Sequence, residues 1–322
     1  MLRFVAARVR QTAIVAFVVT SLSFVLIHAA PGDPLATLDV TPETLGARNQ
    51  LRIDFGLDRP LYEQYPVMLG SFARGRFGTS FSQSRPVSDV LRDVIPDTLL
   101  LMVPALAIGI LLGVAAGTWQ GWAAGRFRDR AASAMELIIL SVPEFLIALV
   151  ASGVFAVRYG WFPATDIMRA GAVYASWADR VGDYAHHAVL PVGTLALVIA
   201  CVVARFQRSA VISTLGEEFV RTARSTGAST MRILFRHVLR RTSASICALL
   251  GLLFPSLVGG AAIVEVVFGW PGAGNTLVTA VGSRDYPLVI ALVTVGSVAV
   301  CVGSALADAA ATIADPATPL DA

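Results

Sequence analysis

Few side chains in this sequence have the types and spacing that catalysis or metal binding requires. All 25 basic residues are arginine, so neither a P-loop lysine nor a Schiff-base lysine is available. The three cysteines stand singly and the four histidines form no HExxH pattern, which predicts no disulfide framework, no metal site and no cofactor. No GxSxG motif occurs either. We expect a chain that is not an enzyme and that does not hydrolyse ATP itself.

A richer pattern lies in segment 208–243, where arginines surround a glycine. Glu217 and Glu218 suit a helix N-terminus, Gly227 stands where a left-handed C-cap is expected, and Ser229 or Thr230 can cap a second helix. Apolar positions recur at helical spacing in both halves: Phe219, Val220, Ala223 and Thr226, then Met231, Leu234, Phe235 and Val238. Such an element can lie on lipid headgroups or dock into a groove of a cytoplasmic protein.

The composition indicates a membrane protein. Hydrophobic residues make up 56% of the 322 residues and charged residues 15%, where soluble domains have about 25% charged residues. Six segments are long and apolar enough to cross a core of about 30 Å, and unbroken apolar runs favour helices over barrel strands. They are 11–30, 98–118, 131–157, 188–204, 244–268 and 287–307. We predict an all-α polytopic membrane protein with six transmembrane helices.

Arginine gathers in three places that share one side if six spans alternate: the first ten residues, the loop after span two, and segment 208–243. The positive-inside rule makes that side the cytoplasm, so both termini should be cytoplasmic. Span one should stay as an uncleaved anchor, because Pro31 follows it directly. The expected division is therefore a tail and first span (1–30), an extracytoplasmic region (31–96), a core with five spans (97–310) and a cytoplasmic tail (311–322).

The two outer segments have no catalytic constellation. Region 31–96 has apolar residues at near-helical spacing, with Pro66 marking the start of a short helix or a kink: Leu61, Tyr65, Met68, Leu69 and Phe72. This helix either caps the outer ends of the spans or offers a contact surface to a partner, and the two roles are compatible. Segment 158–187 contains aromatic residues that prefer the headgroup level: Tyr159, Trp161, Trp177 and Tyr184.

Acidic residues inside apolar segments form the last chemical group. Glu144 follows Pro143, where we expect a break in the helix about halfway along span three, and Glu265 lies near the end of span five. A carboxylate is costly there unless it faces protein, water or a partner. Glu144 is therefore a protonated, hydrogen-bonded acid, the partner of an arginine on another chain, or a lining residue of a polar pathway. We take Pro143, Glu144 and Glu265 as candidate pathway residues.

The motifs together resemble a known family. Arg221-Thr222-Ala223-Arg224, Gly227 and, after nine intervening residues, His237-Val238-Leu239-Arg240 are similar to the "EAA" loop of ABC-importer permeases, in the variant of B-type subunits of dipeptide, oligopeptide and nickel permeases. Further stretches agree in order along the chain: Pro31-Gly32-Asp33-Pro34, Phe55-Gly56-Leu57-Asp58-Arg59-Pro60, Val264-Glu265-Val266-Val267-Phe268-Gly269-Trp270-Pro271-Gly272, Arg284-Asp285-Tyr286-Pro287 and Asp315-Pro316.

This resemblance implies a type I ABC importer (MetI-like) permease fold in the bacterial cytoplasmic membrane. Such a permease pairs with a second homologous permease, two cytoplasmic ATPases and an extracytoplasmic substrate-binding protein, and it has no nucleic-acid partner. The segment around Gly227 would be the coupling helix that docks into the ATPase. The residues expected to couple are Glu218, Arg221, Thr222, Ala223, Arg224, Gly227 and His237.

The cargo implied by the resemblance is a di- or oligopeptide, with nickel chelates and glutathione as alternatives. In the pathway interpretation, Glu144 would hold the cationic amino end of a peptide transiently, since a pathway must release what it binds. A different class, the ion-coupled secondary transporter, usually keeps ionisable residues at membrane depth on broken helices. Only His28, Glu136, Glu144 and Glu265 qualify here, mostly near span ends, and no internal repeat is visible.

Overall fold

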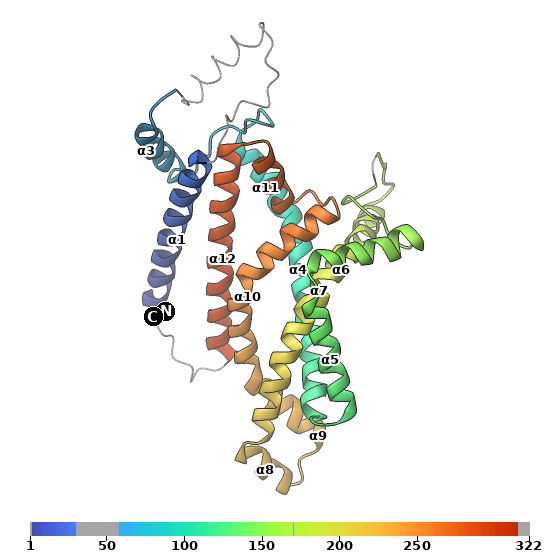
Figure 1. The fold of residues 1–322 in the computed structure, drawn as a ribbon. Helices are drawn as coiled ribbons and strands as arrows, with labels where there is room; N and C mark the ends of the chain where they lie inside the picture. The colour runs from blue at the N-terminus through green and yellow to red at the C-terminus, as the bar shows by residue number, and fades with distance from the viewer. Residues whose placement is uncertain (1, 30–57, 170, 315–322) are drawn as a thin grey trace.

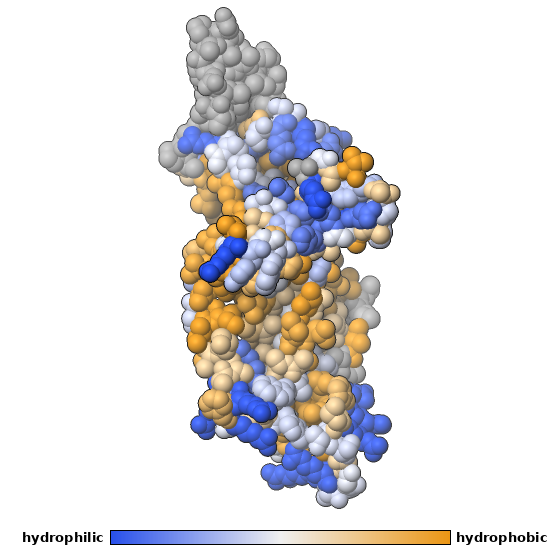
Figure 2. Space-filling model, turned by 90° about the vertical axis from the view of Figure 1, so that its right-hand side faces the viewer, coloured by the Kyte–Doolittle hydropathy of each residue, from blue (hydrophilic) through white to orange (hydrophobic). Residues whose placement is uncertain are grey.

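The computed structural model describes residues 2–29, 58–169 and 171–314, and every regular element in these ranges is a helix. Five helices are long and apolar enough to cross a membrane, and a bent pair makes a sixth candidate. The five are α1 (Leu2–Ala29), α4 (Val87–Trp122), α7 (Trp177–Leu215), α10 (Leu239–Val267) and α12 (Tyr286–Ala314). The predicted all-α polytopic architecture is confirmed. Figure 2 shows a broad hydrophobic band between hydrophilic ends.

The third predicted span, 131–157, is not one continuous helix. It consists of α5 (Phe127–Ser141), then α6 (Glu144–Ala151) and the π-helix η1 (Ser152–Arg158), and the two parts meet at 98°. The cause is Pro143, which has no N–H for the helical ladder and keeps the preceding residue out of the helical region. Val142 is accordingly extended, with φ −87° and ψ 129°. The sequence predicted a proline break here but not a turn of this size.

Two predicted boundaries also fall inside helices. Helix α4 begins at Val87, so the boundary at 96/97 cuts it, and α12 continues to Ala314, beyond the boundary at 310/311. Helix α7 has 39 residues, which at 1.5 Å per residue gives about 58 Å. It is therefore longer than the hydrocarbon core is thick. It also extends beyond the predicted span 188–204 at both ends.

Glycines bring α4 and α7 unusually close together. Gly109, Gly113, Gly117 and Gly121 lie on one face of α4 and are all buried. A Cβ added to Gly113 would lie 2.6 Å from the Cβ of Val203, and one added to Gly109 would lie 2.7 Å from that of Ile199. No side chain fits between the two backbones, so the glycine face fixes the pairing of these helices, as small residues do in membrane bundles.

Helix α1 stands at the edge of the bundle and packs along α12 (Figure 1). Arg8 donates to Asp308 at 2.5 Å, which fixes the start of α1 beside the end of α12. At the opposite end, α3 (Leu61–Phe72) confirms the predicted amphipathic helix, although Pro66 lies inside it and Pro60 precedes it. The short helix α11 (Ala273–Gly282) connects α10 to α12 at this same end.

Several predicted features lie outside the described residues. They are the 30–57 part of the outer region, with Pro31-Gly32-Asp33-Pro34 and Phe55-Gly56-Leu57, and the tail 315–322 with Asp315-Pro316.

Candidate functional site

The helix–glycine–helix element projects from the end of the molecule opposite α3 and α11 (Figure 1). It comprises α8 (Glu218–Ser225), α9 (Thr230–Arg232) and the π-helix η2 (Ile233–Val238), which runs directly into α10. Gly227 has φ +81°, which confirms the predicted left-handed position. The Gly227 N–H donates to the Arg224 carbonyl and the Ala228 N–H to the Ala223 carbonyl, both at 3.0 Å. Ser229, rather than Thr230, caps α9 by accepting from the Arg232 N–H.

A small apolar cluster holds this element on α7. Its buried members are Val211, Val220, Ile233 and Val238, and Ala223 packs against them. The predicted apolar residues of the second helix are divided between two sides: Val238 is buried in this cluster, whereas Met231 and Phe235 are 62% and 65% exposed, and Ile233, which was not among them, is also buried. The reason is the i→i+5 winding of η2, whose wider turn shifts side chains out of the α-helical phase.

The outward side of the element combines arginines with apolar side chains. We call it the coupling surface: Phe219, Arg221, Arg224, Met231, Arg232 and Phe235, all exposed. Among the described residues, none of its arginines forms an ion pair, although the Arg224 guanidinium lies 5.5 Å from the Trp122 ring centroid. An unpaired basic surface with apolar contacts is suited to an acidic protein groove or to lipid headgroups.

The other predicted coupling residues lie close to this surface. Glu218 begins α8 and is exposed. The hydroxyl of Thr222 donates to the Glu218 carbonyl at 3.1 Å, so it serves the helix itself. The His237 ring lies 6.1 Å from the Phe219 ring, centroid to centroid, and joins η2 to α8. The structure therefore brings all seven predicted residues into one compact element.

Sequence reasoning missed the ion pair that anchors the base of this element. Arg208 of α7 donates to both carboxylate oxygens of Asp129 in α5, at 2.6 and 2.8 Å. Asp129 is fully buried and also accepts from the Gly125 N–H at 2.9 Å. Such a bidentate salt bridge fixes the orientation of the two side chains, and so of α5 relative to α7. The only local signal was a single acid in the arginine-rich turn after α4.

Glu144 lies where the broken span meets α10. It is the first residue of α6, directly after the bend, and it is partly buried, whereas Pro143 is exposed. A Cβ placed on Gly260 would come within 2.5 Å of a Glu144 carboxylate oxygen. The Glu144 side chain therefore occupies the space that a side chain at position 260 of α10 would need. Among the described residues, the Glu144 carboxylate has no hydrogen bond and no ion pair.

Glu265 has the opposite surroundings. It is fully buried, and one oxygen accepts from the Thr98 hydroxyl at 2.6 Å. The other oxygen accepts from the N–H groups of Gly274 and Asn275, at 2.7 and 3.0 Å. Glu265 thus caps α11 and ties it to α4. In this conformation it lines no open surface and forms this clamp; Pro143, Glu144 and Glu265 stay a prediction for the pathway.

Asp285 gives a second buried clamp at the same end. Its carboxylate accepts from the Ser80 and Ser82 hydroxyls at 2.5 and 2.7 Å and from the Leu288 N–H at 3.3 Å. It thereby caps α12 and holds the turn before α4. The stretches 264–272 and 284–287, which the sequence marked only by resemblance, supply these two clamps.

Glu136 of α5 is buried in a polar group at the other end of the bundle. It accepts from the Gln120 side chain, while its second oxygen has no partner among the described residues. Gln207 of α7 donates to the hydroxyls of Thr118 and Thr242, both at 3.0 Å. These bonds join α4, α7 and α10 just above the helix–glycine–helix element.

The fold and this site define a multi-pass, all-helical membrane protein with a helix–glycine–helix element projecting from one end. Residues 1–102 match the N-terminal family of binding-protein-dependent transport system membrane components. Residues 109–318 match the binding-protein-dependent transport system inner membrane component. The chain belongs to this family of permease components and is a multi-pass inner-membrane protein.

Similar proteins are known along almost the whole length. The chain is 34% identical over 300 residues to the oligopeptide transport system permease protein AppB of Bacillus subtilis, covering 92% of this chain and 93% of that one. It is 34% identical over 301 residues to a putative peptide permease protein of Brucella ovis, covering 92% of each. It is 33% identical over 290 residues to the glutathione transport system permease protein GsiC of Escherichia coli K12, covering 90% of each.

Proposed function

We propose that this chain is the non-catalytic permease subunit of an ATP-binding-cassette importer for di- or oligopeptides. The observation that carries the proposal is the helix–glycine–helix element. It is held rigidly on α7 by the cluster of Val211, Val220, Ile233 and Val238, yet it presents unpaired arginines and apolar side chains outward. A rigid projection of this kind can transmit movement of a bound ATPase to the spans through α7 and α10.

The same proposal assigns the partners. The coupling surface docks into one of two cytoplasmic ATPases, and a second homologous permease completes the pathway. Helix α6 favours such a neighbour, because it exposes Phe145, Leu149 and Val150 beside the unpaired carboxylate of Glu144. Lipid would cover the apolar residues but not the acid. An extracytoplasmic binding protein delivers the cargo to the α3 end, and both termini lie in the cytoplasm.

The peptide cargo rests on the similar proteins, whose names include oligopeptide, peptide and glutathione transport. Glutathione is itself a tripeptide, so one pathway chemistry serves all three cargoes. Glu144 offers a site for an amino group that each of them carries. The match to a binding-protein-dependent family disfavours an ion-coupled secondary transporter.

The test is uptake and ATP hydrolysis by the complete complex, reconstituted with its ATPases, second permease and binding protein. Gly227→Val forces a β-branched residue into φ +81°, which costs about 1–3 kcal/mol locally. Ala223→Arg adds bulk beside the coupling surface. Both variants should insert into the membrane, and both should lose most of the peptide uptake or the binding of ATPase.

Gly160→Val is the matched control. Gly160 has φ +64°, a Cβ there meets no heavy atom within 4 Å, and it lies after η1, outside the coupling surface, so the strain is similar but the location differs. We expect it to keep ATPase binding. Uptake at the wild-type rate in both Gly227→Val and Ala223→Arg would refute the docking assignment, since an element lying only on lipid tolerates both changes.

A further inference from the structure

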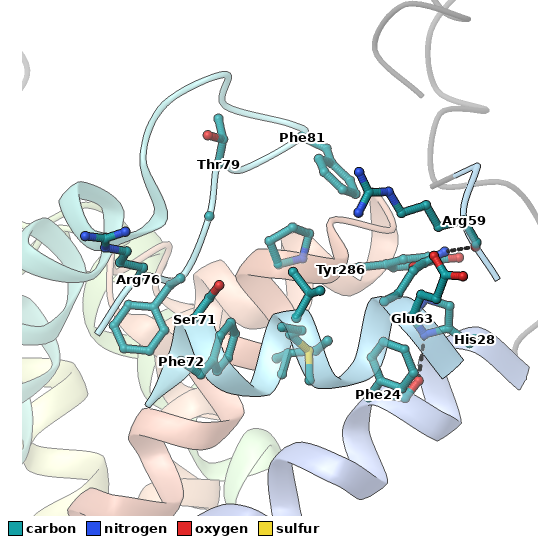
Figure 3. A pocket seen from close by; sticks show the side chains of 17 residues that line it. Phe24, His28, Arg59, Glu63, Ser71, Phe72, Arg76, Thr79, Phe81 and Tyr286 are labelled. Atoms are coloured by element: carbon teal, nitrogen blue, oxygen red, sulfur yellow. Dashed lines mark hydrogen bonds between the residues drawn. The ribbon is translucent and has the colours of Figure 1, made fainter. Parts of the chain in front are cut away.

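A cavity of about 500 Å³ lies between α3, the end of α1 and the beginning of α12 (Figure 3). Its wall is largely apolar and includes Phe24, Met68, Phe72 and Ile290. This volume is within the range of small-molecule sites, which are also mostly apolar with a few polar groups that orient the ligand. The functions assigned above to the chain do not use this cavity.

Charged groups of opposite sign gather at one end of the cavity. Figure 3 shows Arg59 and Glu63 close to His28, while Arg76 lies at the far end. Arg59 and Glu63 are both exposed, and neither side chain forms an ion pair among the described residues. The cavity therefore offers one cation and one anion side by side, each with its charge available to a ligand.

The neighbouring surface is suited to lipid. The cavity lies where the apolar span of α1 ends at Ala29, which is the level of the headgroups. Helix α3 above it exposes Leu61, Tyr62 and Val67, at 49%, 76% and 59%. A short amphipathic helix with exposed apolar and aromatic residues lies in the membrane interface. The cavity thus opens between an interfacial helix and two spans.

We propose that this cavity binds a zwitterionic aminophospholipid, phosphatidylethanolamine in type. Arg59 pairs with the phosphate and Glu63 pairs with the ammonium group. The part of an acyl chain nearest the headgroup covers Met68 and Phe72. An anionic lipid without an amino group offers Glu63 no cation to pair with, and its negative charge repels the Glu63 carboxylate. A free dipeptide has the same pair of charges, but it leaves the apolar wall uncovered.

The experiment uses the full-length chain in its complete complex, in nanodiscs of equal phosphatidylethanolamine and phosphatidylglycerol with identical acyl chains. Lipid that stays bound after a detergent wash is identified by mass spectrometry. Wild type should retain phosphatidylethanolamine preferentially. Arg59→Gln and Glu63→Gln should each lower that retention about three- to fivefold, the effect of losing one partly exposed ion pair. Met68→Trp, which fills the cavity, should lower it as well.

Arg74→Gln is the matched control, because Arg74 is exposed on the same segment but does not line the cavity. It should retain lipid as wild type does. Equal retention in wild type, Arg59→Gln and Glu63→Gln would overturn the proposal, as would preferential retention of phosphatidylglycerol. Displacement of the lipid by a soluble dipeptide would also overturn it in favour of a free zwitterion. No uptake or ATP hydrolysis is measured, so these outcomes leave the proposed function unaffected.

Discussion

Glu265 belongs to α10 and Glu144 lies against it, yet the surroundings of these two carboxylates give them different tasks. Glu265 accepts one hydroxyl and two backbone N–H groups, so its acceptor capacity is used to hold α11. Glu144 has no partner among the described residues and lies against Gly260. A buried acid with partners on both oxygens is part of the fold, whereas one without them needs a ligand, a neighbour or a proton.

Glu144→Gln tests the pathway role. The substitution keeps the shape of the side chain beside Gly260 but removes its charge, so a passing ammonium group loses its transient site. We expect the maximal uptake rate to fall about three- to tenfold, as loss of roughly 1 kcal/mol implies. Assembly and the affinity of the binding protein for peptide should not change. Uptake of radiolabelled peptides by reconstituted complexes provides the measurement.

The control for Glu144→Gln is the cargo itself. A peptide whose amino terminus is acetylated lacks the charge that Glu144 would bind, so its uptake should differ little between wild type and variant. Wild-type rates for both free and acetylated peptides would leave Glu144 with a structural role, such as pairing with an arginine of the second permease.

At the scale of the elements, local signals in the sequence were sufficient where the cause was local. Gly227 was placed correctly and Ser229 was one of two predicted caps, since a left-handed cap and a side-chain cap depend only on neighbouring residues. Ile233 was missed, because the choice of π over α winding in η2 is made by packing on α7. The bend at Pro143 was expected, but a proline does not determine an angle of 98°.

The clamps and ion pairs were beyond prediction because their partners are distant in sequence. Glu265 and Thr98 are 167 positions apart, and Arg208 and Asp129 are 79 apart. Nothing in the pattern of one helix shows which residue of another helix will face it. The sequence consequently marked Glu265 as a candidate pathway residue without indicating its capping role.

The close pairing of α4 and α7 makes a prediction at this scale. Gly113→Leu introduces a side chain where even a Cβ would lie 2.6 Å from Val203. Overpacking of a tight interface costs about 1–3 kcal/mol and more when backbone must shift. We expect a marked loss of thermal stability in detergent, measured by light scattering or by fluorescence-detected size exclusion after heating.

Gly193→Leu is the control for this variant. Gly193 lies on α7 itself, and a Cβ there meets no heavy atom within 4 Å. The Gly193→Leu substitution removes a helical glycine without disturbing the α4–α7 contact. The thermal stability of this variant should therefore equal or slightly exceed that of wild type. An equal loss in both variants would show that glycine flexibility, and not close packing, is what matters.

For the whole molecule, the number of crossings follows from where the helix ends meet. The Arg8–Asp308 ion pair places the start of α1 beside the end of α12, which requires an even number of crossings between them. Five long helices alone would put these ends on opposite faces of the membrane. The bent pair of α5 with α6 and η1 is the candidate for the sixth crossing, despite its 98° bend.

An even number of crossings puts both ends of the bundle on one side of the membrane, and the distribution of arginines indicates which side it is. Arg126, Arg128 and Arg130 follow α4, and eight arginines lie between 205 and 241, so the end with the helix–glycine–helix element should be cytoplasmic. A reporter fused after Ala322 should then behave as cytoplasmic, and one inserted near Gly46 as external.

Insertions in the α4–α5 turn, after Arg126, and in the outer loop, after Gly171, serve as internal standards of opposite expected location. A C-terminal fusion active only outside the cytoplasm would overturn the predicted orientation, because the α1–α12 contact would then place both ends of the bundle outside. It would also move the coupling surface away from any ATPase, so this single measurement bears on both the topology and the proposed docking.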